Sequence, residues 1–170
     1  MTRRLDIRRF SNSFATEEMN TMWVDDIYRI CLSNPQFYRY CETPCTKEQI
    51  IADMQALPAG KTASDKYYVG FLKDGKLIAV LDLIDGYPDE KTAFIGFFMM
   101  DAALQNSGTG SAIVSGLCTY LQEMGFIRVR LCINKGNPQS NHFWHKNGFK
   151  DIKEVERDRE TVILAEKNIV

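Results

Sequence analysis

The chain has 170 residues, of which 45% are hydrophobic and 25% charged, and its 21 Lys and Arg residues nearly balance 22 Asp and Glu residues for a net charge of -1. These values are typical of one globular domain, residues 1-170, with enough chain to bury a full core. Balanced charge argues against nucleic acid or an anionic membrane as the main partner. The densest apolar run, FIGFFMM at 94-100, is too short to span a bilayer.

The N-terminus and the cysteines indicate the compartment. The opening MTRRLDIRRF carries four arginines but not the continuous apolar stretch of a secretory signal, so we expect a cytoplasmic protein. The 5 cysteines are odd in number and irregularly spaced, which favours reduced thiols over a disulfide framework. Cys41 and Cys45 are close together, but the two histidines, His142 and His145, lie far downstream, so no metal site is expected.

Hydrophobic spacing predicts the elements of the first half in chain order. Apolar residues alternate with charged ones over 5-10, which predicts a short first strand. From Thr16 the apolar spacing becomes three and four, which predicts a helix that ends at Asn34-Pro35. Residues 36-45 are interpreted as a loop or short turn, and Thr46 begins a second helix that runs to about Leu57.

The second half predicts most of a sheet. Two β-rich runs flank Asp74-Gly75, the strongest hairpin signal in the chain, and the next run is apolar on both faces, as in a central strand. A Gly-bearing loop then opens an amphipathic helix that Gly125 closes. The expected strands are 67-72, 76-84, 92-100, 128-133, 149-155 and 160-166, with a short helix at 138-146. This order predicts an α/β fold with a mixed sheet, antiparallel except at one right-handed crossover, and helices on both faces.

The loop QNSGTGS at 105-111 is the sharpest local motif. Its glycines let a ligand approach the backbone closely. The helix that follows begins with unpaired backbone amides at the positive end of its dipole, and these amides can bind an anion. An ordinary Gly-rich turn is the alternative. A P-loop is excluded because Ser111 and Ala112 replace Lys and Ser/Thr, and a dinucleotide fingerprint is excluded because Ile113 replaces its third glycine.

Two motifs resemble those of the GCN5-related N-acetyltransferase (GNAT) family. The stretch MDAALQNSGTGS at 100-111 is similar to the family's motif A, with Gln105, Gly108 and Gly110 at its defining positions. The stretch NPQSNHFWHKNGF at 137-149 resembles the family's second motif. Its matching residues are Asn137, Ser140, Lys146, Gly148 and Phe149. The predicted element order is also that of the GNAT acyl-CoA N-acyltransferase fold, so the resemblance covers nearly the whole chain.

The resemblance implies an acetyl-CoA-dependent N-acetyltransferase, in form a bacterial member, that acetylates an amine directly in a ternary complex without a metal. The pyrophosphate would lie on the loop residues Gln105, Asn106, Ser107, Gly108, Thr109, Gly110 and Ser111. The pantetheine arm would lie like an added strand along Phe98, Met99 and Met100, with Asn137 and Ser140 on its other side. Lys135 and Lys146 are candidates for the remaining phosphate. The resemblance is also compatible with a homodimer.

The proton-transfer positions depart from the family pattern. Trp144 stands where the family often has a tyrosine that acts as the general acid, and an indole cannot supply a proton at neutral pH. The two usual positions of the base hold Phe94 and Cys132. We interpret Asp82 as the best candidate base, with Asp85 and Tyr87 as neighbouring alternatives, and Cys132 as either a reactive thiol or a small core residue.

Three further alternatives stay open at this point. Water can take the proton through a relay. His142 and His145 point away from Trp144 around their helix and are interpreted as surface or packing residues. The aromatic segment 37-42 either binds a cationic acceptor or packs between helices. The same fold can also serve as a non-catalytic acyl-CoA-binding module or sensor, or as an interaction domain that binds another phosphate.

Overall fold

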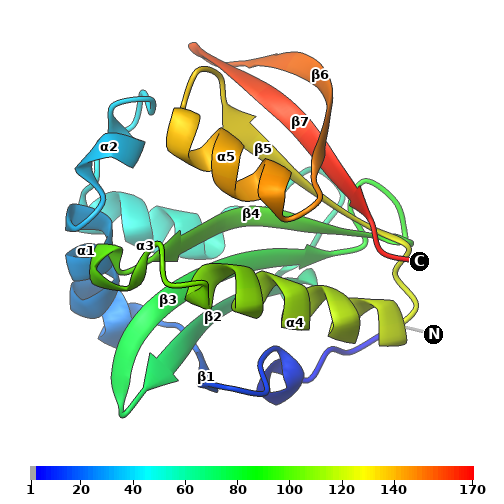
Figure 1. The fold of residues 1–170 in the computed structure, drawn as a ribbon, viewed down its shortest axis with the longest axis horizontal. Helices are drawn as coiled ribbons and strands as arrows, with labels where there is room; N and C mark the ends of the chain where they lie inside the picture. Colours follow the sequence, from blue (N-terminus) through cyan, green and yellow to red (C-terminus); the bar gives the residue numbers. More distant parts are fainter. Residues whose placement is uncertain (1–2) are drawn as a thin grey trace.

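The computed structural model describes residues 3-170 as one seven-stranded mixed sheet with helices on both faces (Figure 1). The strand order is β1-β2-β3-β4-β5-β7-β6, and only β4 and β5 are parallel. The strands are β1 (Ala15–Glu18), β2 (Lys66–Lys73), β3 (Lys76–Asp85), β4 (Thr92–Met100), β5 (Arg128–Asn134), β6 (Lys150–Arg157) and β7 (Glu160–Asn168). The α-helices are α1 (Val24–Leu32), α2 (Pro35–Tyr38), α3 (Lys47–Gln55), α4 (Thr109–Glu123) and α5 (Pro138–Lys146). The predicted fold class is confirmed.

The N-terminal predictions were wrong in two places. Residues 5-10 form no strand; Ile7–Arg9 is a single 3-10 turn, because the Asp6 side chain accepts from the Arg8 amide. Residues 15-18, predicted to begin a helix, form β1, which pairs antiparallel with β2. The helical segment starts later, where the Asn20 side chain accepts from the Met22 amide before the 3-10 turn Thr21–Trp23 and α1.

The remaining boundaries follow the predictions closely. α1 ends before Pro35, which begins the single turn of α2, and Thr46 caps α3 by accepting from the Gln49 amide at 3.0 Å. Asp74 and Gly75 have φ of 52° and 79°, the paired positive values of a two-residue hairpin turn with a primed geometry.

Two hydrophobic clusters cover opposite faces of the sheet. α4 packs on one face through residues such as Ile113 and Leu117, together with the N-terminal Phe10. α1 and α3 pack on the other face through Ile27, Ile30 and Ile50. In Figure 1, α4 lies in front of the sheet, whereas α1 and α3 lie behind it. A ligand that passes through the sheet can therefore contact α4 on one side and α3 on the other.

The sheet opens between β4 and β5. These strands pair only over Thr92–Ile95 and Arg128–Leu131, and past that point they separate. The pairing of β3 with β4 also shifts here, so that Gly96 is an extra residue between the partners of Asp82 and Leu83. Such a bulge bends and twists its strand. The separation and the bulge together leave the backbone of the second half of β4 beside a cavity.

Candidate functional site

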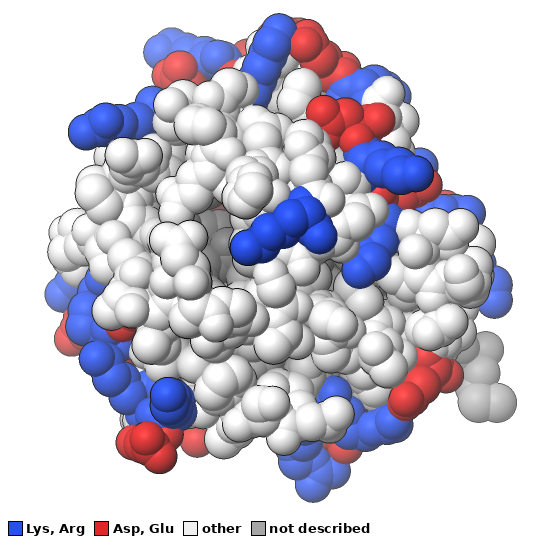
Figure 2. All heavy atoms as spheres, viewed as in Figure 1, with Lys and Arg blue, Asp and Glu red and all other residues white. Residues whose placement is uncertain are grey.

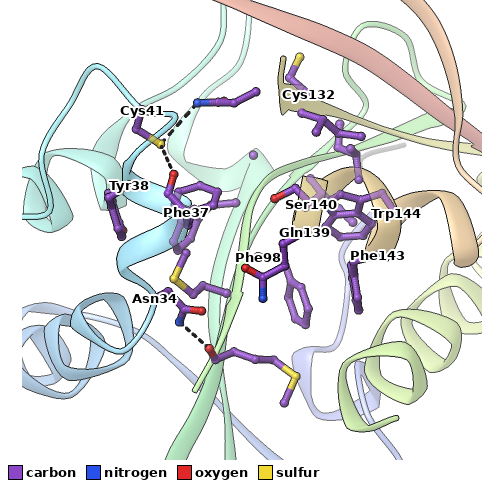
Figure 3. A pocket seen from close by; sticks show the side chains of 18 of the residues that line it. Asn34, Phe37, Tyr38, Cys41, Phe98, Cys132, Gln139, Ser140, Phe143 and Trp144 are labelled. Carbon is purple, nitrogen blue, oxygen red and sulfur yellow. Dashed lines mark hydrogen bonds between the residues drawn. The ribbon is translucent and has the colours of Figure 1, made fainter. Parts of the chain in front are cut away.

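A cavity of about 420 Å³ occupies the gap between β4 and β5. Figure 2 shows a hollow on this face, surrounded mainly by uncharged atoms with a basic side chain beside it. The close-up in Figure 3 places Asn34, Phe37, Tyr38 and Cys41 on one side, with Phe98 and the α5 residues Gln139, Ser140, Phe143 and Trp144 on the other. We call this space the central cavity; its lining also includes Phe94–Met100, Leu131–Asn134, and parts of α3, the β4-α4 loop and the β6-β7 turn.

The β4-α4 loop presents unpaired backbone amides to one end of the cavity. Gly108 caps α4 with a φ of 82°, in the left-handed region that favours glycine. Within residues 3-170, none of the amides at 106-111 donates a hydrogen bond to a protein acceptor. Because these amides lie at the positive end of a 15-residue helix, the loop suits an anionic ligand.

Gly110 allows α4 to approach the cavity wall closely. A Cβ at this position would lie 2.9 Å from Met100 Sδ and 3.1 Å from Phe143 Cε1, both closer than ordinary contact. The glycine therefore keeps the amides of the α4 first turn against β4 and α5. This cradle fits the phosphates that the family resemblance implies.

Most residues of the loop line the cavity, and some of their side chains also brace the loop. The predicted residues that line it are Gln105, Asn106, Gly108, Gly110 and Ser111, whereas Ser107 and Thr109 share a hydrogen bond of 2.9 Å and do not. Gln105 Nε2 donates to Asn34 Oδ1 at 2.5 Å, and its Oε1 accepts from Gln139 Nε2 at 2.8 Å. Gln105 thus joins the loop to the start of α2 and to α5.

The predicted pantetheine strip lies along the cavity. Phe98, Met99 and Met100, along which the family resemblance would place the pantetheine arm, all line the cavity. The Met100 carbonyl accepts from Asn34 Nδ2 at 2.8 Å, so its hydrogen-bonding capacity is partly used within the protein. The ring of Phe98 stacks on Phe143 at 6.1 Å, which makes the wall apolar at this level.

The α5 residues divide between the cavity and the helix itself. Ser140 lines the cavity, but Asn137 does not; it is 2% exposed and caps α5 by accepting from the Ser140 amide at 3.2 Å. Trp144 lines the cavity, and its ring packs edge-on against Phe98 and Phe149. Of the two candidate lysines, Lys146 lines the cavity, whereas Lys135 pairs with Glu154 at 2.8 Å.

The predicted base candidates lie at different depths. Asp82 does not line the cavity; its Oδ2 lies 3.0 Å from Lys66 Nζ, and its Oδ1 is buried without a partner among the described residues. Its carboxylate fills the place that a side chain at Gly96 would take, since a Cβ there would lie 2.8 Å from Asp82 Oδ2. Burial raises the pKa of Asp82 more than Lys66 lowers it.

The other base candidates either contact other side chains or hold a thiol that burial keeps protonated. Asp85 pairs with Arg3 at 2.7 Å, and the ring of Tyr87 packs edge-on against Phe94. Cys132 lines the cavity half-buried, and burial raises the pKa of its thiol, which disfavours a nucleophilic thiolate. Phe94 lines the cavity as well.

The two histidines differ in position. His142 lines the cavity, whereas His145 Nε2 lies 2.7 Å from Asp151 Oδ1 on the outside.

Sequence reasoning missed Asp53. This carboxylate lines the cavity from α3, and burial raises its pKa. Its helix was predicted, and the spacing of Thr46, Gln49, Ile50 and Asp53 places them on one helical face. That stripe was the available signal.

Residues 3-170 contain neither a metal-binding cluster nor a helix that could span a membrane. No cluster of three or more His, Cys, Asp or Glu side chains is placed to hold a metal ion among these residues. Within the same part of the chain, each helix falls short of the length and apolarity that crossing a membrane requires.

The chain resembles solved acetyltransferases across most of its length. An acetyltransferase from Thermus thermophilus is 17% identical, with a TM-score of 0.73, covering 91% of this chain and 96% of that one. The Salmonella typhimurium acetyl transferase that modifies the N-terminal serine of ribosomal protein L7/L12 is 16% identical, with a TM-score of 0.73, covering 94% and 96%. The PaiA N-acetyltransferase from Thermoplasma acidophilum, solved with coenzyme A, is 14% identical, with a TM-score of 0.67, covering 92% and 99%.

At these identities the structural likeness establishes the fold. No curated protein matches the chain. The family model described as "Acetyltransferase (GNAT) family" matches residues 24–149, a stretch that includes α1, the β4-α4 loop and α5. The chain therefore belongs to the GNAT acetyltransferases, a family of acyltransferase enzymes.

Proposed function

We propose that the protein transfers an acetyl group from acetyl-CoA to a primary amine of a small molecule or peptide, by direct transfer in a ternary complex. The observation that carries this proposal is the row of free amides at 106-111 beside a cavity that opens between β4 and β5. The amides would hold the pyrophosphate, and Phe98–Met100 would lie along the pantetheine arm. Lys146 would add one positive charge near the phosphates. A homodimer and a cytoplasmic location stay predictions.

The transfer requires one proton to leave the amine. The amine nitrogen bonds to the acetyl carbonyl carbon, the carbon-sulfur bond breaks, and the leaving thiolate needs little help because its pKa is about 8.5. We assign the proton to Asp82, whose Oδ2 lies behind Gly96 and whose Oδ1 has no partner among the described residues, with water carrying the proton from the amine. The raised pKa of Asp82 brings it closer to that of an effective base at neutral pH. Trp144 can donate a hydrogen bond to sulfur but cannot give up a proton.

Substitution of Asp82 tests the assigned route. If Asp82 accepts the proton, Asp82→Asn removes the acidic limb of the pH profile of kcat and lowers kcat, provided that the variant folds. Asp85→Asn is the matched control on the same strand, because Asp85 is also a buried carboxylate in an ion pair, but its partner is Arg3. An unchanged pH profile in Asp82→Asn would show that the proton leaves by another route.

Thermal unfolding tests cofactor binding separately from chemistry. Acetyl-CoA at about 100 times its Kd stabilises the fold by about 2.7 kcal/mol, which is roughly 5–11 °C in Tm for a chain of this size. ATP at the same concentration serves as the comparison ligand. A shift with ATP but not with acetyl-CoA would reject both the enzyme and the acyl-CoA sensor, and would favour an interaction domain that binds another phosphate.

A further inference from the structure

The central cavity has opposite charge preferences on the two faces of the sheet. Free amides and Lys146 occupy the α4 side, which suits anions. On the α1-α3 side the stripe of Thr46, Gln49, Ile50 and Asp53 faces the cavity. If the phosphates lie on the first side, as the proposed function requires, the acceptor reaches the thioester from the second.

Asp53 is the carboxylate on this side that is free to bind a ligand. Its Oδ1 accepts from Gln49 Nε2 at 2.8 Å, and within residues 3-170 no basic side chain forms an ion pair with it. Lys66 donates to the Asp53 backbone carbonyl at 2.8 Å and forms its ion pair with Asp82, and its charge also lowers the pKa of Asp53 without an ion pair. The other carboxylate of the lining, Glu160, is already used, because it accepts from the Glu42 amide and lies 3.8 Å from Arg157.

The aromatic lining of the same cavity suits a molecule with an aliphatic body and a cationic group. Phe37 packs edge-on against Tyr38 at 5.1 Å and against Phe97 at 6.1 Å, and all three rings line the cavity. Aromatic faces attract cations as well as aliphatic chains. Burial raises the pKa of Asp53, so the charged carboxylate lacks full solvation and gains from a cationic partner.

The segment 40-42 limits the size of the acceptor. The Asn134 side chain on β5 donates to the Tyr40 carbonyl, and the Glu42 amide donates to Glu160 on β7. These contacts tie the segment after α2 across the gap between β4 and β5. A cavity of about 420 Å³ that also receives the acetyl end of the cofactor leaves room for a small amine.

We propose that Asp53 determines acceptor specificity by binding a second cationic group on a small amine with an aliphatic body, while the neutral amine at its other end is acetylated. This inference rests on the proposed function. The acceptor class is therefore a small diamine or polyamine. A monoamine of equal length lacks the group that pairs with Asp53, and an amino acid of equal length places a carboxylate against it.

The test compares cadaverine, n-pentylamine and δ-aminovalerate as acceptors for the wild type, Asp53→Asn and the control Glu48→Gln. Glu48 lies exposed on the same helix, outside the cavity lining. The wild type should prefer cadaverine over pentylamine by about tenfold to a hundredfold in kcat/KM, through KM, and should reject aminovalerate. Asp53→Asn should remove the preference by raising KM for cadaverine toward that of pentylamine, and Glu48→Gln should retain the preference.

The following outcomes separate this inference from the proposed function. Equal use of cadaverine and pentylamine by the wild type, or a preference that survives Asp53→Asn, overturns the role of Asp53 while acetyl transfer stands. A lower kcat and a shifted pH profile for pentylamine in Asp53→Asn would make Asp53 the base, which also overturns it. If no amine turns over, calorimetric titration of cadaverine into the CoA-bound protein decides: binding that Asp53→Asn removes supports the inference, and absent or unchanged binding rejects it.

Discussion

Lys66 is the residue whose replacement most directly tests the electrostatics beneath the site. Its Nζ donates to Asp82 Oδ2 at 3.0 Å and to the carbonyls of Asp53 and Ala56 at 2.8 Å and 2.7 Å, and its side chain is only 6% exposed. One buried charge therefore neutralises Asp82 and binds carbonyls at the C-terminal end of α3.

Lys66→Met leaves Asp82 charged, buried and without its counterion. Removal of one partner of a buried pair costs about 3–5 kcal/mol, which for a chain of this size lowers Tm by roughly 6–20 °C. Asp82→Asn costs less, because Lys66 keeps its two carbonyl partners. The double variant therefore loses less than the sum of the single losses.

The loss in Lys66→Met also depends on pH, with a definite sign. Burial raises the pKa of Asp82, and loss of the lysine raises that pKa further. Above the raised pKa the unpaired charge destabilises the fold; below it, Asp82 is neutral and the destabilisation disappears. Stability relative to the wild type should therefore recover as pH falls toward the ordinary value of the carboxyl.

Urea unfolding at about pH 7 and about pH 5, followed by circular dichroism, measures both effects. We expect a large loss at the higher pH and a smaller one at the lower pH. A variant within about 1 kcal/mol of the wild type at both pH values, or with the same loss at both, would refute the assignment of Asp82 as a buried charged partner of Lys66.

Four more substitutions have defined outcomes. Asp53→Asn should raise Tm at neutral pH, because burial raises the pKa of Asp53 and its charge destabilises the fold. The gain in Tm should vanish as pH falls through that raised pKa. An unchanged Tm at neutral pH would contradict the statement that burial destabilises the charged carboxylate. Gly110→Ala should lower the free energy of unfolding by about 1–3 kcal/mol and weaken acetyl-CoA binding in titration calorimetry. At Gly116 a Cβ meets nothing within 4 Å, so Gly116→Ala should stabilise the fold by about 0.5–1 kcal/mol and leave binding intact. Thr46→Ala removes the α3 cap and should lower Tm by about 2–4 °C; an unchanged Tm in calorimetric scans would show that the cap contributes nothing.

The sequence predicted the part of the fold in which local signals and tertiary packing agree. The two-residue turn at Asp74-Gly75, the apolar β4 and the helix after Gly108 each carry their own pattern, so the crossover and the anion cradle followed. At the N-terminus the signals conflict. Glu17 and Glu18 resemble the acidic first turn of a helix, yet they form β1 because pairing with the free edge of β2 outweighs local propensity.

The groups around the reaction centre were harder to predict, because register and helix facing decide them. Asp82 lies beneath the site only because the extra residue Gly96 bends β4, and no sequence pattern specifies that bulge. Asp53 enters the site because α3 turns one face toward the cavity, which depends on how α3 packs against α1. Asn137 matches the family motif, but its buried side chain caps α5.

The central claim is acetyl transfer to an amine, and release of free thiol from acetyl-CoA measures it most directly. The assay runs a panel of polyamines, aminoglycosides, amino acids and peptide N-termini, with mass spectrometry of the acceptor to detect the acetylated product. Amine-dependent thiol release matched by acetylated product is the predicted result. A Tm raised by acetyl-CoA together with no thiol release from any amine of the panel would contradict it, and would indicate a non-catalytic acyl-CoA-binding protein with the same fold.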